Sequence, residues 1–320
     1  MTGIHKVNWK KIIEKYIIWI IFIVFCLVLS FSTTGFFTKN NIINILRQVS
    51  YNGVIACGMT FVITLGDIDL SVGSIVGYAA IVACSFAHPG EYPLGVTIAI
   101  ALALGAAIGL VNGLGVAFGH VPAFIMTLGT QLIVRGMIML YNNGKPVLNL
   151  SDQYRKIGSG YIGAIPIPVV ILVGVLVVSW FMLNKTKFGR HVLALGGNEQ
   201  AARISGVNTK FTRIMVFVFS GMCAAVAGMI ISARVNAGSP TLGDGYELDA
   251  IAASVIGGTS MSGGYGSITG TVAGVLIIGV INNGLDLLNV SAYYQQVIRG
   301  AIIVGAVLFD MYSKHRKEGK

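Results

Sequence analysis

The sequence predicts an all-α polytopic membrane protein of about ten transmembrane helices, and three observations support this. Only 11% of its 320 residues are charged, whereas a soluble domain of this length carries about 25%. Hydrophobic residues make up 55% of the chain, and the mean hydropathy is +0.79. Apolar stretches near the length of about 20 residues that crosses a bilayer recur along the whole chain. Most of the protein surface must therefore face lipid.

Ten apolar stretches are the candidate spans, and we expect them to form one transmembrane domain over residues 1–320. The eighth is the weakest, because it contains two carboxylates and breaks into the glycine-rich run GGTSMSGGYG. The first follows basic residues but lacks a small-residue cleavage site, which favours an uncleaved helix over a signal peptide. The stretches are residues 16–32, 42–65, 71–87, 94–118, 122–141, 167–183, 212–233, 247–260, 267–288 and 293–312.

The distribution of Lys and Arg predicts the orientation, because positive charge marks the cytoplasmic side of a membrane. Basic residues cluster before the first stretch, in the loop 184–213 after the sixth, and after the tenth. An even number of spans places all three clusters on one side, whereas nine or eleven would separate the basic ends. We therefore expect a multi-pass protein of the cell membrane with both termini in the cytoplasm. The outer loop 142–166, which also carries basic residues, is the exception.

The net charge of +10 does not predict a nucleic-acid partner. The basic residues lie at the two ends and in one central loop, and they form no stripe interleaved with aromatic residues. The orientation of the spans explains the charge instead.

Two pairs of stretches resemble each other and predict an inverted repeat. Residues 109–114 are similar to 279–285, and residues 131–136 are similar to 295–300. In a ten-span arrangement the members of each pair run in opposite directions. Inverted repeats require this and commonly enclose a transport path. A chance similarity between glycine-rich helices is the alternative.

Ionisable residues within the spans are candidate functional groups. A charge at the bilayer centre costs about 2.5–3.5 kcal/mol on insertion scales, so it pairs with another charge or lines a wet cavity. We expect Arg135 and Arg299, matched within the repeat, to form structural ion pairs with carboxylates such as Asp286 or Glu247.

A second group lies at the break between the second and third stretches. It contains Asp67 and Asp69, followed by Ser71 and Gly73. Two interpretations remain open: the carboxylates cap the third helix at its cytoplasmic end, or the break borders a translocation path.

The central loop predicts a short helix over residues 199–205. Asn198 is a good N-cap, Glu199 suits the positive first turn, and Gly206 can end the helix in a left-handed conformation. Ala201 and Ala202 would offer a close-fitting surface. A helix this short is marginal in water and needs a docking partner. The alternative is a basic connector that lies on the lipid headgroups.

Motifs for catalysis, nucleotides and metals are missing from the sequence. No GxxxxGK[ST] phosphate loop occurs, so any ATP must be bound by another chain. The five histidines and four cysteines have no metal-ligand spacing, and no nucleophile motif is present. We therefore predict no catalytic residue, no metal site and no cofactor in this chain, and an enzyme is disfavoured.

The central loop resembles the coupling segment of binding-protein-dependent ABC importers, where a short helix docks into the ATPase. Gln200-Ala201-Ala202-Arg203-Ile-Ser-Gly206 is similar to the EAA-x-x-x-G core of that family. It departs with Gln at the Glu position and without the downstream Ile-x-Leu-Pro. The resemblance implies that residues of this loop contact the ATPase. The residues expected to do so are Asn198, Glu199, Ala201, Ala202, Arg203 and Gly206.

Further segments narrow the resemblance to the ribose-type monosaccharide permeases. They run from the second stretch to the end, although Asp67 replaces the more usual glycine before IDLS. The segments are LGDIDLSVGS (65–74), FIMTLGTQLIVRG (124–136), LGGNEQAARISG (195–206), GYELDAIAASVIGGTSMSGGYGSITGT (245–271) and NNGLDLL (282–288).

This resemblance implies a fold like that of type II ABC importers and a specific set of partners. They are a second copy of the chain around a central sugar path, an ATPase subunit with two fused nucleotide-binding halves that holds ATP and Mg, and an extracytoplasmic sugar-binding protein. The expected function is the membrane-spanning permease of an ATP-driven importer for a ribose-like pentose or a hexose. The alternatives are a related permease for autoinducer-2 or a nucleoside, and a secondary sugar transporter driven by an ion gradient.

Overall fold

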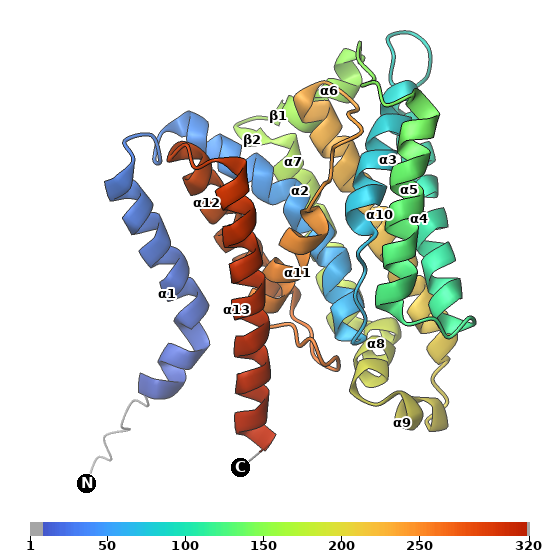
Figure 1. Ribbon diagram of the computed structural model, residues 1–320, viewed down its shortest axis with the longest axis vertical. Helices are drawn as coiled ribbons and strands as arrows, with labels where there is room; N and C mark the ends of the chain where they lie inside the picture. Colours follow the sequence, from blue (N-terminus) through green and yellow to red (C-terminus); the bar gives the residue numbers. More distant parts are fainter. Residues whose placement is uncertain (1–8, 319–320) are drawn as a thin grey trace.

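The computed structural model describes residues 9–318, which form thirteen α-helices and one two-stranded hairpin (Figure 1). The elements are α1 (Trp9–Ser32), α2 (Lys39–Thr64), α3 (Val72–Ser85), α4 (Leu94–Ala117), α5 (Ala123–Asn142), α6 (Asp152–Ser159), β1 (Tyr161–Ile162), β2 (Ile165–Pro166), α7 (Ile167–Lys185), α8 (Lys187–Gly197), α9 (Glu199–Ile204), α10 (Thr209–Val235), α11 (Tyr246–Ile256), α12 (Ile268–Leu287) and α13 (Ala292–Glu318).

Eight of the described helices are long enough to cross a bilayer. Five of them, α4, α5, α7, α10 and α12, have both the length and the apolar composition of a span. Helices α1, α2 and α13 contain 24, 26 and 27 residues, and about 20 residues suffice at about 1.5 Å per residue. The predicted all-α polytopic membrane fold is confirmed.

The third and eighth predicted spans are not complete helices. Helices α3 and α11 contain only 14 and 11 residues, so they cover about 21 and 17 Å of a hydrocarbon layer that is about 30 Å thick. A non-helical segment precedes each of them. Figure 1 shows one segment rising from the end of α2 to α3, and the other descending from the end of α10 to α11. Each crossing is thus a short helix joined to a non-helical segment.

Glycine explains where these two crossings break. Gly66 precedes α3 with a φ of 81°, and Gly243 and Gly245 precede α11 with φ of 81° and 80°. These are left-handed conformations that glycine adopts without steric cost. The hydropathy of the sequence predicted the crossings, but it could not show that their helices are short.

The helices confirm the predicted inverted repeat. Both α2–α5 and α10–α13 consist of a long helix, a short helix and two long helices. The corresponding members run in opposite directions in Figure 1. Helix α10 packs against α3 and α4, while α2 packs against α11 and α12, so each half contributes its first helix to the other half. The start of α1 and the end of α13 lie at the same end of the molecule as α8 and α9.

Helices α2 and α10 form the centre of the core, and glycine sets the packing of α10 on α4. Gly105, Gly109 and Gly113 recur every four residues and therefore lie on one face of α4. A Cβ at any of them would overlap backbone atoms of α10. Small residues at such spacing let membrane helices approach closely.

Three of the cysteines are also small core residues, since Cys57, Cys84 and Cys223 are buried and form no disulfide.

Replacing Gly109 by alanine should destabilise the protein, because the added Cβ meets the backbone at Phe217, which cannot move aside as a side chain can. We expect a loss of about 1–3 kcal/mol, seen as a lower melting temperature in detergent. Gly95 of the same helix has open space around it, so Gly95→Ala should leave the melting temperature unchanged or slightly higher. Equal melting of both variants would contradict the close contact of α4 with α10.

Candidate coupling segment and transport path

The central loop contains one helix that the sequence analysis missed. Helix α8 places Val192 and Leu195 in the core with relative exposures of 0% and 2%, and the ring of Phe188 stacks on Phe61 at 6.3 Å. These apolar residues recur at i, i+4 and i+7, which is the spacing of one helix face. The signal was therefore present in the sequence, within a stretch interpreted only as a basic connector and a short helix.

The short helix predicted in the central loop is present as α9. The Asn198 side chain accepts a hydrogen bond from the backbone N–H of Ala201 at 2.9 Å. At the other end Gly206 has a φ of 81°. The N–H of Gly206 donates to the carbonyl of Arg203, and that of Val207 to the carbonyl of Ala202, both at 3.1 Å. These bonds form a Schellman motif, which ends the helix as predicted.

The surface that α9 offers to a partner differs from the predicted one. Ala202 is only 4% exposed and packs inward, so it cannot form the close-fitting outer surface expected of it. Ala201 lies on the exposed side, together with Ile204, which is 88% exposed. Because the two are three residues apart, they share one face of the helix. The sequence analysis missed Ile204, although an isoleucine at this spacing from Ala201 was visible.

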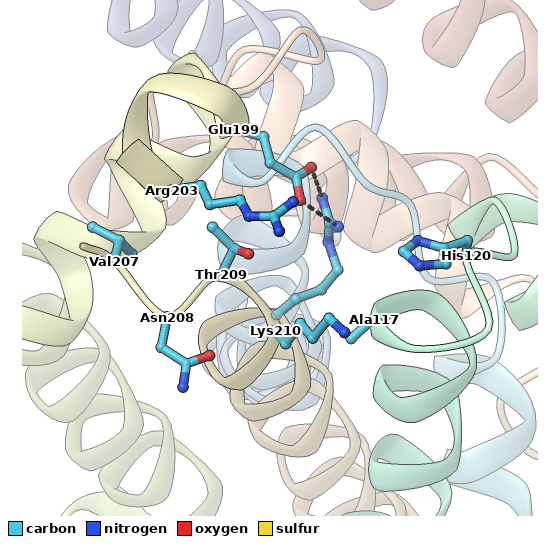
Figure 2. Close-up of a pocket in the computed structure, with 9 residues that line it drawn as sticks. Ala117, His120, Glu199, Arg203, Val207, Asn208, Thr209 and Lys210 are labelled. Carbon is cyan, nitrogen blue, oxygen red and sulfur yellow. Dashed lines mark hydrogen bonds and ion pairs between the residues drawn. The ribbon is translucent and has the colours of Figure 1, made fainter. Parts of the chain in front are cut away.

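Arg213 joins Asp67 to Glu199, two residues for which the sequence predicts different roles. Arg213, in the first turns of α10, donates through Nε to Asp67 Oδ2 at 3.1 Å and through Nη2 to Glu199 Oε2 at 3.1 Å. Figure 2 shows the bonds to Glu199 as dashed lines. Asp67 therefore does not cap α3 but is joined through Arg213 to α9.

This ion-paired group borders a pocket of about 250 Å³ between α9 and the start of α10. Figure 2 shows Glu199, Arg203 and Lys210 around it, with His120 on the opposite side. The pocket separates α9 from the ends of the membrane helices α4 and α10.

Asp69 and Ser71 lie within a buried chain of hydrogen bonds, and neither side chain reaches the surface. Ser71 donates its N–H and its Oγ–H to Asp69 Oδ1 at 3.0 and 2.6 Å. Asn112 donates to Ser71 Oγ at 2.8 Å and accepts from Thr130 at 2.6 Å. This chain ties the α2–α3 break to α4 and α5. Asp69 and Ser71 are therefore enclosed between the helices of this chain.

Arg135 binds both broken crossings near the centre of the membrane. Its guanidinium donates to the carbonyls of Pro240 and Leu242 at 3.0 Å and to that of Gly73 at 3.2 Å, and it pairs with Asp244 at 2.5 Å. The predicted structural ion pair exists, but its partner is neither Glu247 nor Asp286. The run of turns before α11 places Asp244 beside the Arg135 guanidinium.

Arg299 occupies the matching place on α13. Its Nε lies 4.0 Å from Asp249, whose other oxygen accepts a hydrogen bond from Asn282 at 3.1 Å. Asp286, the expected partner, instead accepts from Gln295 at 3.0 Å. Asp286 lies near the end of α12 and is exposed.

Glu247 at the start of α11 lies against Gly73 of α3, where the two short helices approach each other. The Glu247 side chain accepts from Gln131 at 3.2 Å, and it lies where a Cβ on residue 73 would overlap its carboxylate. Gly73 is therefore glycine because α3 and the start of α11 approach closely at this point. A carboxylate beside the first turn of α3 also suits the positive end of that helix.

Comparison with known proteins connects this geometry to a family. The model of a family described as the branched-chain amino acid transport system / permease component matches residues 41–307. The chain belongs to this permease family. No solved structure matches the chain.

Several curated relatives cover nearly the whole chain. The ribose import permease protein of Escherichia coli is 48% identical over 88% of this chain and 89% of its own length. The corresponding protein of Haemophilus influenzae is 44% identical over 92% of each chain. That of Bacillus subtilis is 42% identical over 97% of this chain and 96% of its own. The resemblance to ribose-type permeases is thus confirmed.

Removing the Arg213 side chain should destabilise the protein, because Asp67 would remain buried without its partner. A broken buried pair costs about 3–5 kcal/mol, and the 16% and 15% exposure of the two side chains places this pair near that case. We expect Arg213→Ala to lower the melting temperature, and the double variant with Asp67→Asn to recover part of the loss. Arg203→Ala, which removes an exposed arginine from the same segment, is the control. Equal effects of the two arginine variants would contradict the structural role of the pair.

Proposed function

We propose that this chain is the permease subunit of an ATP-driven ribose importer. Its relatives are ribose import permeases of similar length. The observation that carries the coupling to ATP is α9, a capped short helix that exposes Ala201 and Ile204 beyond the membrane helices. An isoleucine with 88% of its surface exposed is a suitable anchor for a partner protein.

The partner at α9 is an ATPase subunit with two fused nucleotide-binding halves, which holds ATP and Mg. An extracytoplasmic sugar-binding protein delivers ribose to the opposite end of the molecule. Two copies of the chain enclose the path, and both termini lie in the cytoplasm with α8 and α9. The common end of α1, α9 and α13 in Figure 1 supports this orientation.

The ion-paired group transmits force from α9 to the membrane helices. A push on α9 moves Glu199, and the Arg213 guanidinium links Glu199 both to α10 and to Asp67. Asp67 begins the extended segment before α3, and α10 packs along α3 and α4. Closure of the ATPase would therefore displace α3 and α10 together. No residue of this chain carries out chemistry in this scheme.

The proposal predicts ribose uptake that requires ATP. We expect proteoliposomes with the permease, its ATPase and a ribose-loaded binding protein to accumulate labelled ribose only when ATP is present. The ATP must be on the side of the membrane where the ATPase lies. Dissipating proton and sodium gradients should leave uptake unchanged. Ala201→Arg should abolish uptake, because the added bulk and charge lie on the exposed face of α9.

Ala201→Ser, which keeps a small residue at the same site, is the matched control and should retain uptake. Both variants should reach the membrane in equal amounts. Uptake that follows an ion gradient without ATP would overturn the proposal in favour of a secondary transporter. Normal uptake by Ala201→Arg would remove α9 from the coupling.

A further inference from the structure

The pocket between α9 and α10 lies at the depth of the lipid headgroups. Its lining includes Ala117, the last residue of α4, and Thr209, the first residue of α10. The two helices contain 24 and 27 residues, so each is at least about 36 Å long and exceeds a hydrocarbon layer that is about 30 Å thick. Their ends therefore extend into the polar region of the membrane, and the pocket lies in that region.

Positive charge is in excess around this pocket. Arg203, Lys210 and Arg213 line it, and Glu199 is the acidic residue among the described residues that do so. Both oxygens of the Glu199 carboxylate accept from Arg213, at 3.4 and 3.1 Å. Even when Asp67, the other partner of Arg213, is counted, three cations face two carboxylates. One negative charge from a ligand would balance them.

Two of the three cations have no carboxylate partner. The ion pairs among the described side chains involve other basic residues, so Arg203 and Lys210 are left without one. Figure 2 shows that they enter the pocket from two different elements, Arg203 from α9 and Lys210 from α10. A guanidinium and an ammonium are both multiple donors, and the planar guanidinium matches the oxygens of a phosphate group. The pocket therefore suits a phosphate.

The size and charge of the pocket limit the kind of phosphate. Its volume of about 250 Å³ is below the range of about 300–1,000 Å³ for sites that enclose drug-sized ligands. A phosphate group fits this volume better than a whole nucleotide does. The single positive charge in excess matches a phosphodiester with one negative charge, whereas a phosphate monoester carries about 1.5 to 2.

An exposed apolar stripe on α4 leads to the pocket. Leu110, Leu114 and Phe118 recur every four residues and therefore share one face of the helix and its end. Their side chains are 42%, 42% and 56% exposed. The Lys210 ammonium lies 4.4 Å from the centre of the Phe118 ring, so the stripe ends where the cations begin. Acyl chains can lie along such a surface, and basic pockets between membrane helices bind anionic headgroups.

We propose that this pocket binds the phosphodiester of an anionic phospholipid, in the leaflet on the α9 side of the membrane. Arg203 and Lys210 hold the phosphate, and the acyl chains lie along the apolar stripe of α4. The bound lipid connects α9 to α10 and α4 by a route that is separate from the Arg213 ion pairs. This inference goes beyond the proposed function, because binding requires neither the ATPase nor the sugar.

The test measures lipid binding to the full chain, purified in a nonionic detergent. Native mass spectrometry gives the fraction of chains with bound dioctanoylphosphatidylglycerol as its concentration is raised. Dioctanoylphosphatidylcholine has the same chains without net charge, and glycerophosphoglycerol has the same phosphodiester without acyl chains. The pocket variants are Arg203→Gln and Lys210→Gln.

The matched controls are Arg190→Gln and Lys187→Gln. These residues of α8 are exposed, lie at the same end of the molecule and do not line the pocket. The controls remove the same charges as the pocket variants. All four variants should melt like the unmodified chain, because each side chain is exposed.

We expect one phosphatidylglycerol per chain, bound more tightly than phosphatidylcholine, and no binding of glycerophosphoglycerol at the same concentrations. Arg203→Gln and Lys210→Gln should each raise the Kd about five-fold, and together about 25-fold. The paired control variant should leave the Kd unchanged.

Unchanged lipid binding by the pocket variants would overturn the site. Equal weakening by the pocket pair and the control pair would also overturn it, because the lipid would then be held only by the general positive charge of this end. Glycerophosphoglycerol that binds as tightly as the lipid would replace the lipid by a soluble phosphodiester. Equal binding of phosphatidylcholine would contradict the match of net charge. Since the permease is measured alone, none of these results depends on whether α9 contacts an ATPase.

Discussion

The Arg135 guanidinium satisfies a requirement on which the middle of this protein depends. Within a bilayer, every backbone polar group needs a partner inside the protein. The two short helices α3 and α11 leave non-helical chain before them, and its carbonyls lack the bonds that a continuous helix would supply. Arg135 donates to two of these carbonyls, those of Pro240 and Leu242, and to the carbonyl of Gly73 in the first turn of α3, and Asp244 balances its charge. One side chain thus allows two crossings to break and meet.

The same break is connected to α9. The extended segment before α3 begins beside Asp67, which is bonded to Arg213 and through it to Glu199 of α9. It ends at Asp69 and Ser71, which are bonded to α10 and α4. A displacement at α9 can therefore reach α3, α4 and α10 through hydrogen bonds and ion pairs.

The sequence predicted those features that depend on local pattern. The caps of α9 follow from Asn198 and Gly206, because capping involves residues only a few positions apart. The number of crossings and their inverted arrangement follow from hydropathy and from matched segments. Helix α8 was not predicted, although its apolar residues have the spacing of one helix face. The prediction for that loop relied on its basic residues instead.

Features that depend on contacts through space were not predictable. The partner of Arg135 is Asp244 because the run of turns before α11 brings that carboxylate beside the guanidinium. No local sequence pattern shows where such a segment ends. Ala202 faces inward because α9 packs on the chain itself, which hydropathy does not reveal. Arg213 had been interpreted only as a basic residue that marks orientation, although it joins Asp67 to Glu199.

The central claim is that α9 lies in the cytoplasm, where a separate ATP-consuming protein contacts it. The most direct measurement is labelling of Ser205→Cys, an exposed position just beyond α9, with a membrane-impermeant maleimide. The account predicts labelling in inside-out vesicles and none in right-side-out vesicles. Glu91→Cys, in the exposed loop between α3 and α4, should give the opposite result. Labelling of residue 205 from outside would contradict the orientation and the ATP-driven mechanism with it.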